Sequence, residues 1–149
     1  MIDYFEERAS ELALLTSRQR LEHIIQKGEQ HDGLDEAERI EDNKVEGCQS
    51  NAYLVVSNDD TVTIKTDADS KIVRGYLAYL SEGFTGLASS TIQQEAQESV
   101  EHFVSKGGLE ATFTPNRSDA FTNTGDAILT SLHSTYTCLL YTSDAADAT

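Results

Sequence analysis

The chain has 149 residues, with 11 Lys and Arg against 26 Asp and Glu, a formal net charge of −15 and a pI near 4.4. Nucleic acids and anionic membrane surfaces would repel such a chain, so we expect neither as a partner. Residues 1–7 carry no basic or apolar signal region, and no apolar run is long enough to span a bilayer. Solubility is the simplest explanation of the acidity. A saline habitat and a basic docking face on a protein partner are two sharper ones.

The first half of the chain predicts two helices followed by a polar loop. Thr16 with Gln19 forms the pattern of a capping box, and Gly28 predicts the end of the second helix. Residues 29–44 are polar and acidic, which predicts a loop with one helical turn. Apolar residues recur at helical spacing in the first helix at Ile2, Phe5, Ala9, Leu12 and Leu15, and in the second at Leu21, Ile24 and Ile25.

The spacing of apolar residues then changes to that of strands. Residues 50–57 are rich in strand-forming residues around the apolar run 52–56, residues 58–60 form a turn, and residues 61–65 alternate apolar with polar side chains. Together they predict a β-hairpin. Because two strands alone are rarely stable, we expect a third strand from residues 109–113 or near Val45.

Helices return after the hairpin. One begins at Ser70, with Asp69 or Ser70 as its N-cap, and a fourth is predicted to begin with a second capping box at Ser90 and Gln93 and to end at Gly107. Residues 114–117 form a turn, and a last helix runs from Ser118 past Leu132. This order predicts an α+β fold, in which a small antiparallel sheet of about three strands packs against several helices.

The two cysteines differ in their surroundings. Cys138 opens a segment that resembles the translation of a transposase adapter used in DNA library preparation. We interpret residues 138–149 as foreign sequence and residues 1–137 as one domain, the alternative being a natural C-terminal tail. Cys48 is then the single native thiol, which fits a reducing cytoplasm. A lone thiol cannot serve as a dithiol oxidoreductase.

Three segments resemble one known family. Residues 45–54, Val-Glu-Gly-Cys-Gln-Ser-Asn-Ala-Tyr-Leu, are similar to the active-cysteine motif of the SufE/CsdE sulfur acceptors. Residues 67–75 and 114–118 are similar to later blocks of that family, in the same order. The likeness covers residues 5–130 and implies a SufE/NifU-like fold. This chain departs from the family at Tyr53, where Trp is usual, and at Ala120, where Gly is usual.

The resemblance implies a sulfur carrier for iron–sulfur cluster assembly. A pyridoxal-phosphate cysteine desulfurase, SufS/CsdA-like, would pass persulfide sulfur to Cys48, and the carrier would deliver it to a SufBCD-like iron–sulfur scaffold complex. Such a protein stimulates its desulfurase and holds no cofactor of its own; it is not a stand-alone enzyme. Gly47, Gln49 and Ser50 would form the supporting loop, and Arg117 would contact the persulfide or the partner.

Other interpretations remain for these residues. Cys48 could be a buried structural cysteine in a non-catalytic interaction module, which is the usual fate of a lone cysteine. A one-cysteine thiol peroxidase is disfavoured, because no acid–base partner is apparent beside the thiol. Arg117 could equally be a solvated or capping arginine, and Asp67 and Asp69 are interpreted as cap and turn residues. No metal site is expected, because one thiol and four histidines without ligand spacing do not supply the ligands: His23, His31, His102 and His133.

Overall fold

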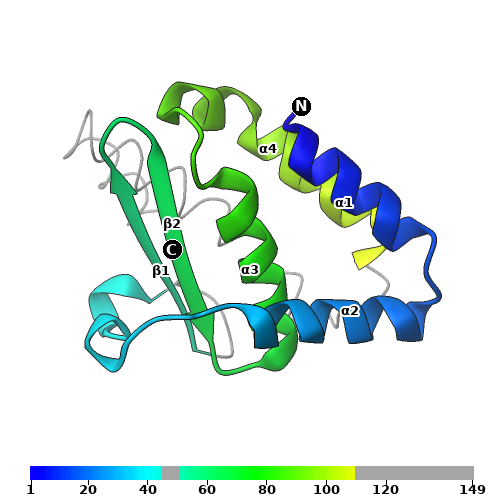
Figure 1. Ribbon diagram of the computed structural model, residues 1–149, viewed down its shortest axis with the longest axis horizontal. Coiled ribbons are helices and arrows are strands. Elements are labelled where there is room, and N and C mark those ends of the chain that lie inside the picture. Colours follow the sequence, from blue (N-terminus) through cyan, green and yellow to red (C-terminus); the bar gives the residue numbers. More distant parts are fainter. Residues whose placement is uncertain (45–50, 110–149) are drawn as a thin grey trace, which may run out of the picture.

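The computed structural model describes residues 1–44 and 51–109. It confirms the α+β fold, in which a β-hairpin packs against helices (Figure 1). The elements follow one another along the chain as α1 (Asp3–Ala13), α2 (Ser17–Gln30), the short 3-10 helices η1 (Glu36–Glu38) and η2 (Glu41–Asn43), β1 (Ala52–Asn58), β2 (Val62–Ala68), α3 (Lys71–Phe84) and α4 (Ser89–Lys106).

Helix α3 is the centre of the described fold. Figure 1 shows the hairpin on one side of it, α1 and α4 side by side on the other, and α2 crossing near its N-terminal end. Eleven of its 14 residues are buried, which agrees with its being the most apolar of the four α-helices in the described residues. Aromatic rings join it to α1 and α4, with Phe5 4.9 Å from Phe84 and Tyr79 5.2 Å from Phe103 between ring centroids.

Helix α2 begins as the sequence predicts. The Gln19 backbone N–H donates to Thr16 Oγ1 at 3.2 Å, and the Thr16 N–H donates to the Gln19 side chain at 3.1 Å, which completes the capping box. Of the two candidate caps for α3, Ser70 is the N-cap: its hydroxyl accepts from the Val73 N–H at 3.4 Å.

The capping box expected at Ser90 was wrong. Helix α4 begins at Ser89, and its N-cap is Ala88, which makes no side-chain capping bond. The reason lies in the preceding residue: the Leu87 carbonyl accepts from the Val62 N–H at 2.8 Å, so pairing with β2 fixes the chain just before the helix. The expected end at Gly107 was right, since Gly107 is the C-cap.

Gly28 does not end α2, which continues to Gln30. Instead it lies where α2 crosses α3, against Gly75. A Cβ added to Gly28 would lie 2.7 Å from the Gly75 nitrogen, and one added to Gly75 would lie 1.9 Å from the Ile24 carbonyl oxygen. Glycine is therefore present here for close backbone approach, not for helix termination.

The hairpin is antiparallel, with Ala52 opposite Ala68 at its open end and Asn58 opposite Val62 at its turn. Strand β2 extends three residues beyond the predicted Lys65. Within the described residues the sheet has two strands, and the third strand expected near Val45 is represented only by a single bridge between Lys44 and Tyr53. The other candidate strand, 109–113, falls almost entirely outside the described residues.

Candidate functional site

The residues singled out from the sequence as the site lie outside the described residues. They are Gly47, Cys48, Gln49, Ser50 and Arg117, and the segment 138–149 lies outside as well. The structure does describe both positions from which the chain enters and leaves the cysteine motif, Lys44 and Asn51, and the contacts that hold these two positions in place.

Both flanking positions are fixed at the open end of the hairpin. On the N-terminal side, Lys44 forms an antiparallel bridge with Tyr53 of β1. On the C-terminal side, the Asn51 side-chain amide donates to Asp69 Oδ2 at 2.9 Å, and the Asp69 N–H donates to the Asn51 carbonyl at 3.0 Å. Asp69 is thus a turn residue, as interpreted from the sequence, and it ties the start of β1 to the start of α3.

An ion pair between Asp67 and Arg74 lies next to this end of the hairpin. The Arg74 guanidinium also donates from Nε to the Gly28 carbonyl at 2.8 Å and from Nη2 to the His31 carbonyl at 2.7 Å. It therefore adds donors at the C-terminus of α2, where carbonyls lack their usual helical partners and the Gly28 carbonyl also accepts the His31 N–H at 3.2 Å. One side chain of α3 joins the end of β2 to the end of α2.

The Asp67 carboxylate is buried, with 4% of its side chain exposed. Besides Arg74 it accepts the Leu34 N–H at 3.0 Å and the Ala68 N–H at 2.9 Å. Gly33, with φ of 72°, lies directly over the pair, and a Cβ there would be 2.8 Å from Asp67 Oδ2. Asp67 is therefore a buried ion-pair partner, a role beyond that of the cap or turn residue interpreted from the sequence.

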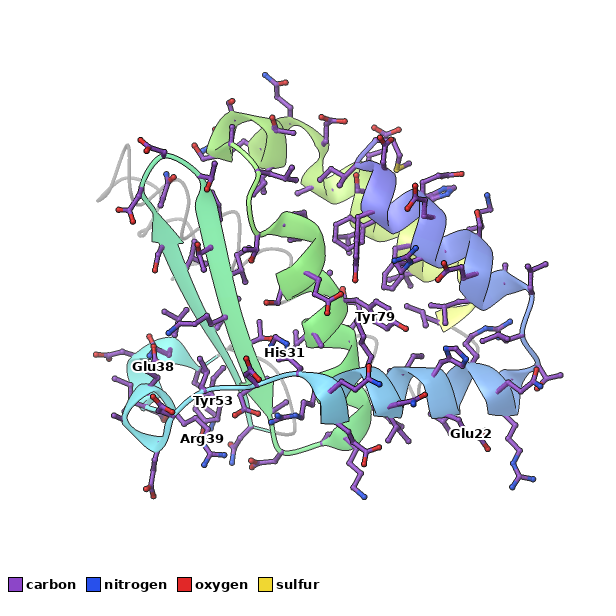
Figure 2. The ribbon with its side chains drawn as sticks, viewed as in Figure 1. Glu22, His31, Glu38, Arg39, Tyr53 and Tyr79 are labelled. Carbon is purple, nitrogen blue, oxygen red and sulfur yellow. The ribbon has the colours of Figure 1, made fainter. Side chains whose placement is uncertain are left out.

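His31, at the end of α2, completes this polar cluster. Its Nε2 lies 3.3 Å from the Thr66 hydroxyl of β2, and Figure 2 shows the ring between the hairpin and α3. Burial lowers the pKa of His31 below its usual 6.5, and the positive charge of Arg74 lowers it further. The imidazole is therefore neutral at neutral pH.

In the described part of the site, polar side chains hold backbone positions in place. Among residues 1–44 and 51–109, no three His, Cys, Asp or Glu side chains gather closely enough to hold a metal ion. No helix in this part of the chain is both long and apolar enough to cross a membrane.

Sequence reasoning did not find the roles of His31 and Arg74. Arg74 stood only within the block of residues 67–75 that resembles the family, and His31 was only one of four histidines without ligand spacing. One signal was available in the sequence. Asp67 and Arg74 have opposite charges and stand seven residues apart, one near the end of β2 and the other in the first turns of α3, which is close enough for an ion pair across the connection.

Comparison with known proteins shows similarity to one family. The family model of SufE, described as an Fe-S metabolism associated domain, matches residues 6–131. An uncharacterized SufE-like protein of Synechocystis is 31% identical over 107 residues, covering 71% of this chain and 65% of the relative. A SufE-like protein of Rhizobium meliloti is 32% identical over 78 residues, covering 49% and 56%. The chain thus spans less than two thirds of either relative's length.

The fold has a solved counterpart as well. The solution structure of a hypothetical protein from Thermus thermophilus superposes with a TM-score of 0.73, covering 90% of this chain and 96% of that one. Its sequence is 15% identical to this chain, so the likeness concerns the fold alone.

Proposed function

Because the chain belongs to the SufE family, which is associated with Fe-S metabolism, we propose that it accepts persulfide sulfur on Cys48 from a cysteine desulfurase. The observation that carries this proposal is the family match over residues 6–131, within which the Gly-Cys-Gln-Ser motif stands between two anchored positions, Lys44 and Asn51.

The anchoring supports the proposal through covalent geometry. Three peptide links separate Cys48 from Asn51, so their Cα atoms are at most about 11 Å apart. Asn51 is tied to Asp69, and the neighbouring strand ends are tied through Asp67 and Arg74 to α2 and α3. The Cys48 Cα is therefore held within about 11 Å of a fixed position at the open end of the hairpin.

The proposed transfer is a thiol–persulfide exchange. The Cys48 thiolate attacks the terminal sulfur of a persulfide on the desulfurase cysteine, a sulfur–sulfur bond forms at Cys48, and the original bond breaks to release the enzyme's thiolate. No net oxidation occurs. Delivery of this sulfur to an iron–sulfur scaffold complex completes the proposed cycle, and removal of sulfur from the desulfurase raises its turnover.

The proposed exchange needs groups that stabilise the sulfur anion. A net charge of −15 opposes thiolate formation, so local donors are required to stabilise the sulfur anion. We assign this role to Ser50, the backbone N–H groups of the motif and Arg117, and we assign to Gly47 and Gln49 the backbone support of Cys48. The pyridoxal phosphate belongs to the partner enzyme.

A desulfurase assay with intact-protein mass measurement tests the proposal. With a purified SufS-type cysteine desulfurase and cysteine, the protein should gain the mass of one sulfur atom and should increase sulfide release. Cys48→Ser should abolish both effects, while Cys138→Ser, a matched loss of the other cysteine, should change neither. Equal sulfur loading of the Cys48→Ser variant and the wild type would refute the assignment.

A further inference from the structure

An exposed isoleucine stands out beside the cysteine motif. Ile40 lies between η1 and η2, and its exposed fraction is 46%. Within the described residues it is one of three large apolar side chains that are exposed, and the other two, Met1 and Leu14, lie at the start and the end of α1. Only Ile40 lies next to the chain that leads into Cys48.

The segment that carries Ile40 is firmly held. The Asn43 N–H donates to the Ile40 carbonyl at 3.0 Å, and the Asn43 side-chain amide donates to the Glu38 carbonyl at 2.8 Å. Lys65 of β2 reaches both carboxylate oxygens of Glu38, at 2.9 and 3.1 Å. Ile40 is thus presented on a preorganised backbone, which lowers the entropy lost when a partner binds it.

Carboxylates flank Ile40 on both sides in the sequence. Asp35, Glu36, Glu41 and Asp42 are all exposed, and the ion pairs found among the described residues involve none of them. Arg39 is the one exposed cation in the segment. The segment joins β1 through the bridge between Lys44 and Tyr53, a half-buried aromatic residue, and Figure 2 shows the labelled Glu38 and Arg39 toward the open end of the hairpin.

We propose that residues 35–44 form the docking surface for the sulfur-donating enzyme, whose matching face carries an apolar socket bordered by lysine or arginine side chains. This inference rests on the proposed function. An apolar centre within a charged rim is the arrangement of specific protein interfaces, in which the centre supplies affinity and the rim steers association. The acidic rim selects a basic partner face, and Lys44 ends the surface four residues before Cys48.

Titration of the protein into a SufS-type desulfurase assay tests this surface. Ile40→Ser should raise the concentration needed for half-maximal stimulation about fivefold, because part of an isoleucine side chain no longer becomes buried. The rate at saturation should be unchanged, since Cys48 is intact. Leu14→Ser is the matched control, because Leu14 is 87% exposed and lies at the far end of α1; it should leave the titration unchanged.

Charge reversal tests the rim independently of Ile40. Glu41→Lys with Asp42→Lys should weaken stimulation about tenfold at low salt, and the difference from wild type should shrink as salt rises. The matched control, Glu98→Lys with Glu101→Lys on α4, changes the net charge equally and should have a much smaller effect.

The outcomes separate the two proposals. Absence of stimulation and of sulfur on Cys48 in the wild-type protein refutes the proposed function itself. Normal wild-type stimulation with unchanged titrations for both Ile40→Ser and the Glu41/Asp42 reversal refutes the docking surface alone. Should Ile40→Ser fail to fold, the charge-reversal pair still decides the question.

Discussion

Replacing Arg74 with alanine should destabilise the fold more than any other single loss of positive charge on the described surface. The substitution removes the ion pair with Asp67 and the hydrogen bonds to the carbonyls of Gly28 and His31. It therefore disconnects α3 from the end of β2 and from the end of α2 at the same time.

The expected loss of unfolding free energy follows from burial. Removing one partner of a buried ion pair typically costs about 3–5 kcal/mol, because the remaining charge is left without compensation. The Asp67 side chain is 4% exposed, but that of Arg74 is 27% exposed, so water can replace part of what is lost. We therefore expect the lower end of this range, about 3 kcal/mol, or a decrease in Tm of about 6–12 °C for a domain of this size.

Urea and thermal unfolding of Arg74→Ala and Arg18→Ala provide the measurement. Arg18 is 90% exposed and pairs with Glu22 at 3.3 Å, so its loss should cost about 0.5 kcal/mol or less. Both variants remove one positive charge from the same acidic protein, so general charge repulsion changes equally. In an Asp67→Asn background, Arg74→Ala should cost less than in the wild type. Equal losses of unfolding free energy for Arg74→Ala and Arg18→Ala would show that the buried ion pair stabilises the fold no more than an exposed one.

Four further predictions concern stability. Gly75→Ala should lose about 1–3 kcal/mol in urea unfolding, since its Cβ would lie 1.9 Å from the Ile24 carbonyl oxygen; a gain would disprove the close crossing. Thr16→Ala should lose about 1 kcal/mol and Thr16→Ser almost none, whereas equal values would mean that the capping box is unimportant. Because folding lowers the pKa of His31 below 6.5, the unfolded chain binds more protons, so the stability that neutral His31 provides is present above pH 6.5 and lost as pH falls; His31→Gln should reduce this pH dependence of the unfolding free energy, and an unchanged dependence would contradict the assignment. The Tm should rise with added salt, because salt screens repulsion within a chain of net charge −15, and a constant Tm would argue against this explanation.

Local signals predicted most of the helices. The Thr16–Gln19 box spans one helical turn, and the apolar stripe of α3 recurs every three or four residues, so both patterns are contained in short stretches of sequence. Strand β2 was predicted too short because its end depends on a contact with another element. Asp67 looks like a residue outside a strand, and it can be buried in one only because Arg74 compensates its charge.

The role of Gly28 shows where sequence reasoning fails. A glycine near the end of a helical pattern usually marks termination, and here the helix continues two residues further. The deciding factor is Gly75, 47 positions away, whose backbone occupies the space that a side chain at Gly28 would need. No local pattern contains that information.

The candidate site likewise has one part that the sequence predicts and one part that it does not. The cysteine motif could be identified from ten consecutive residues, and the family match agrees with that identification. The assignments of Cys48 and Arg117 themselves remain predictions. The connections that fix both flanks of the motif could not be predicted, because they join β1 and the residue before it to residues that follow η2 and β2, which only the folded chain brings together.

Two arginines show how an acidic chain stabilises the ends of its helices. The C-terminus of a helix carries partial negative charge, and α1 has no basic residue in its last turn. Arg20 of α2 supplies the positive charge there and donates to the Leu12 and Leu15 carbonyls at 3.1 and 3.0 Å. Arg74 of α3 does the same at the C-terminus of α2, where it donates to the Gly28 carbonyl. Each guanidinium donates to at least two carbonyls in different directions, and Arg20 reaches a third at Gly108, which a lysine cannot reproduce. Because these contacts are partly buried, salt screens them less than it screens the exposed carboxylates. The free energy lost in Arg74→Ala should therefore be nearly the same at low and high salt, even as the whole protein becomes more stable.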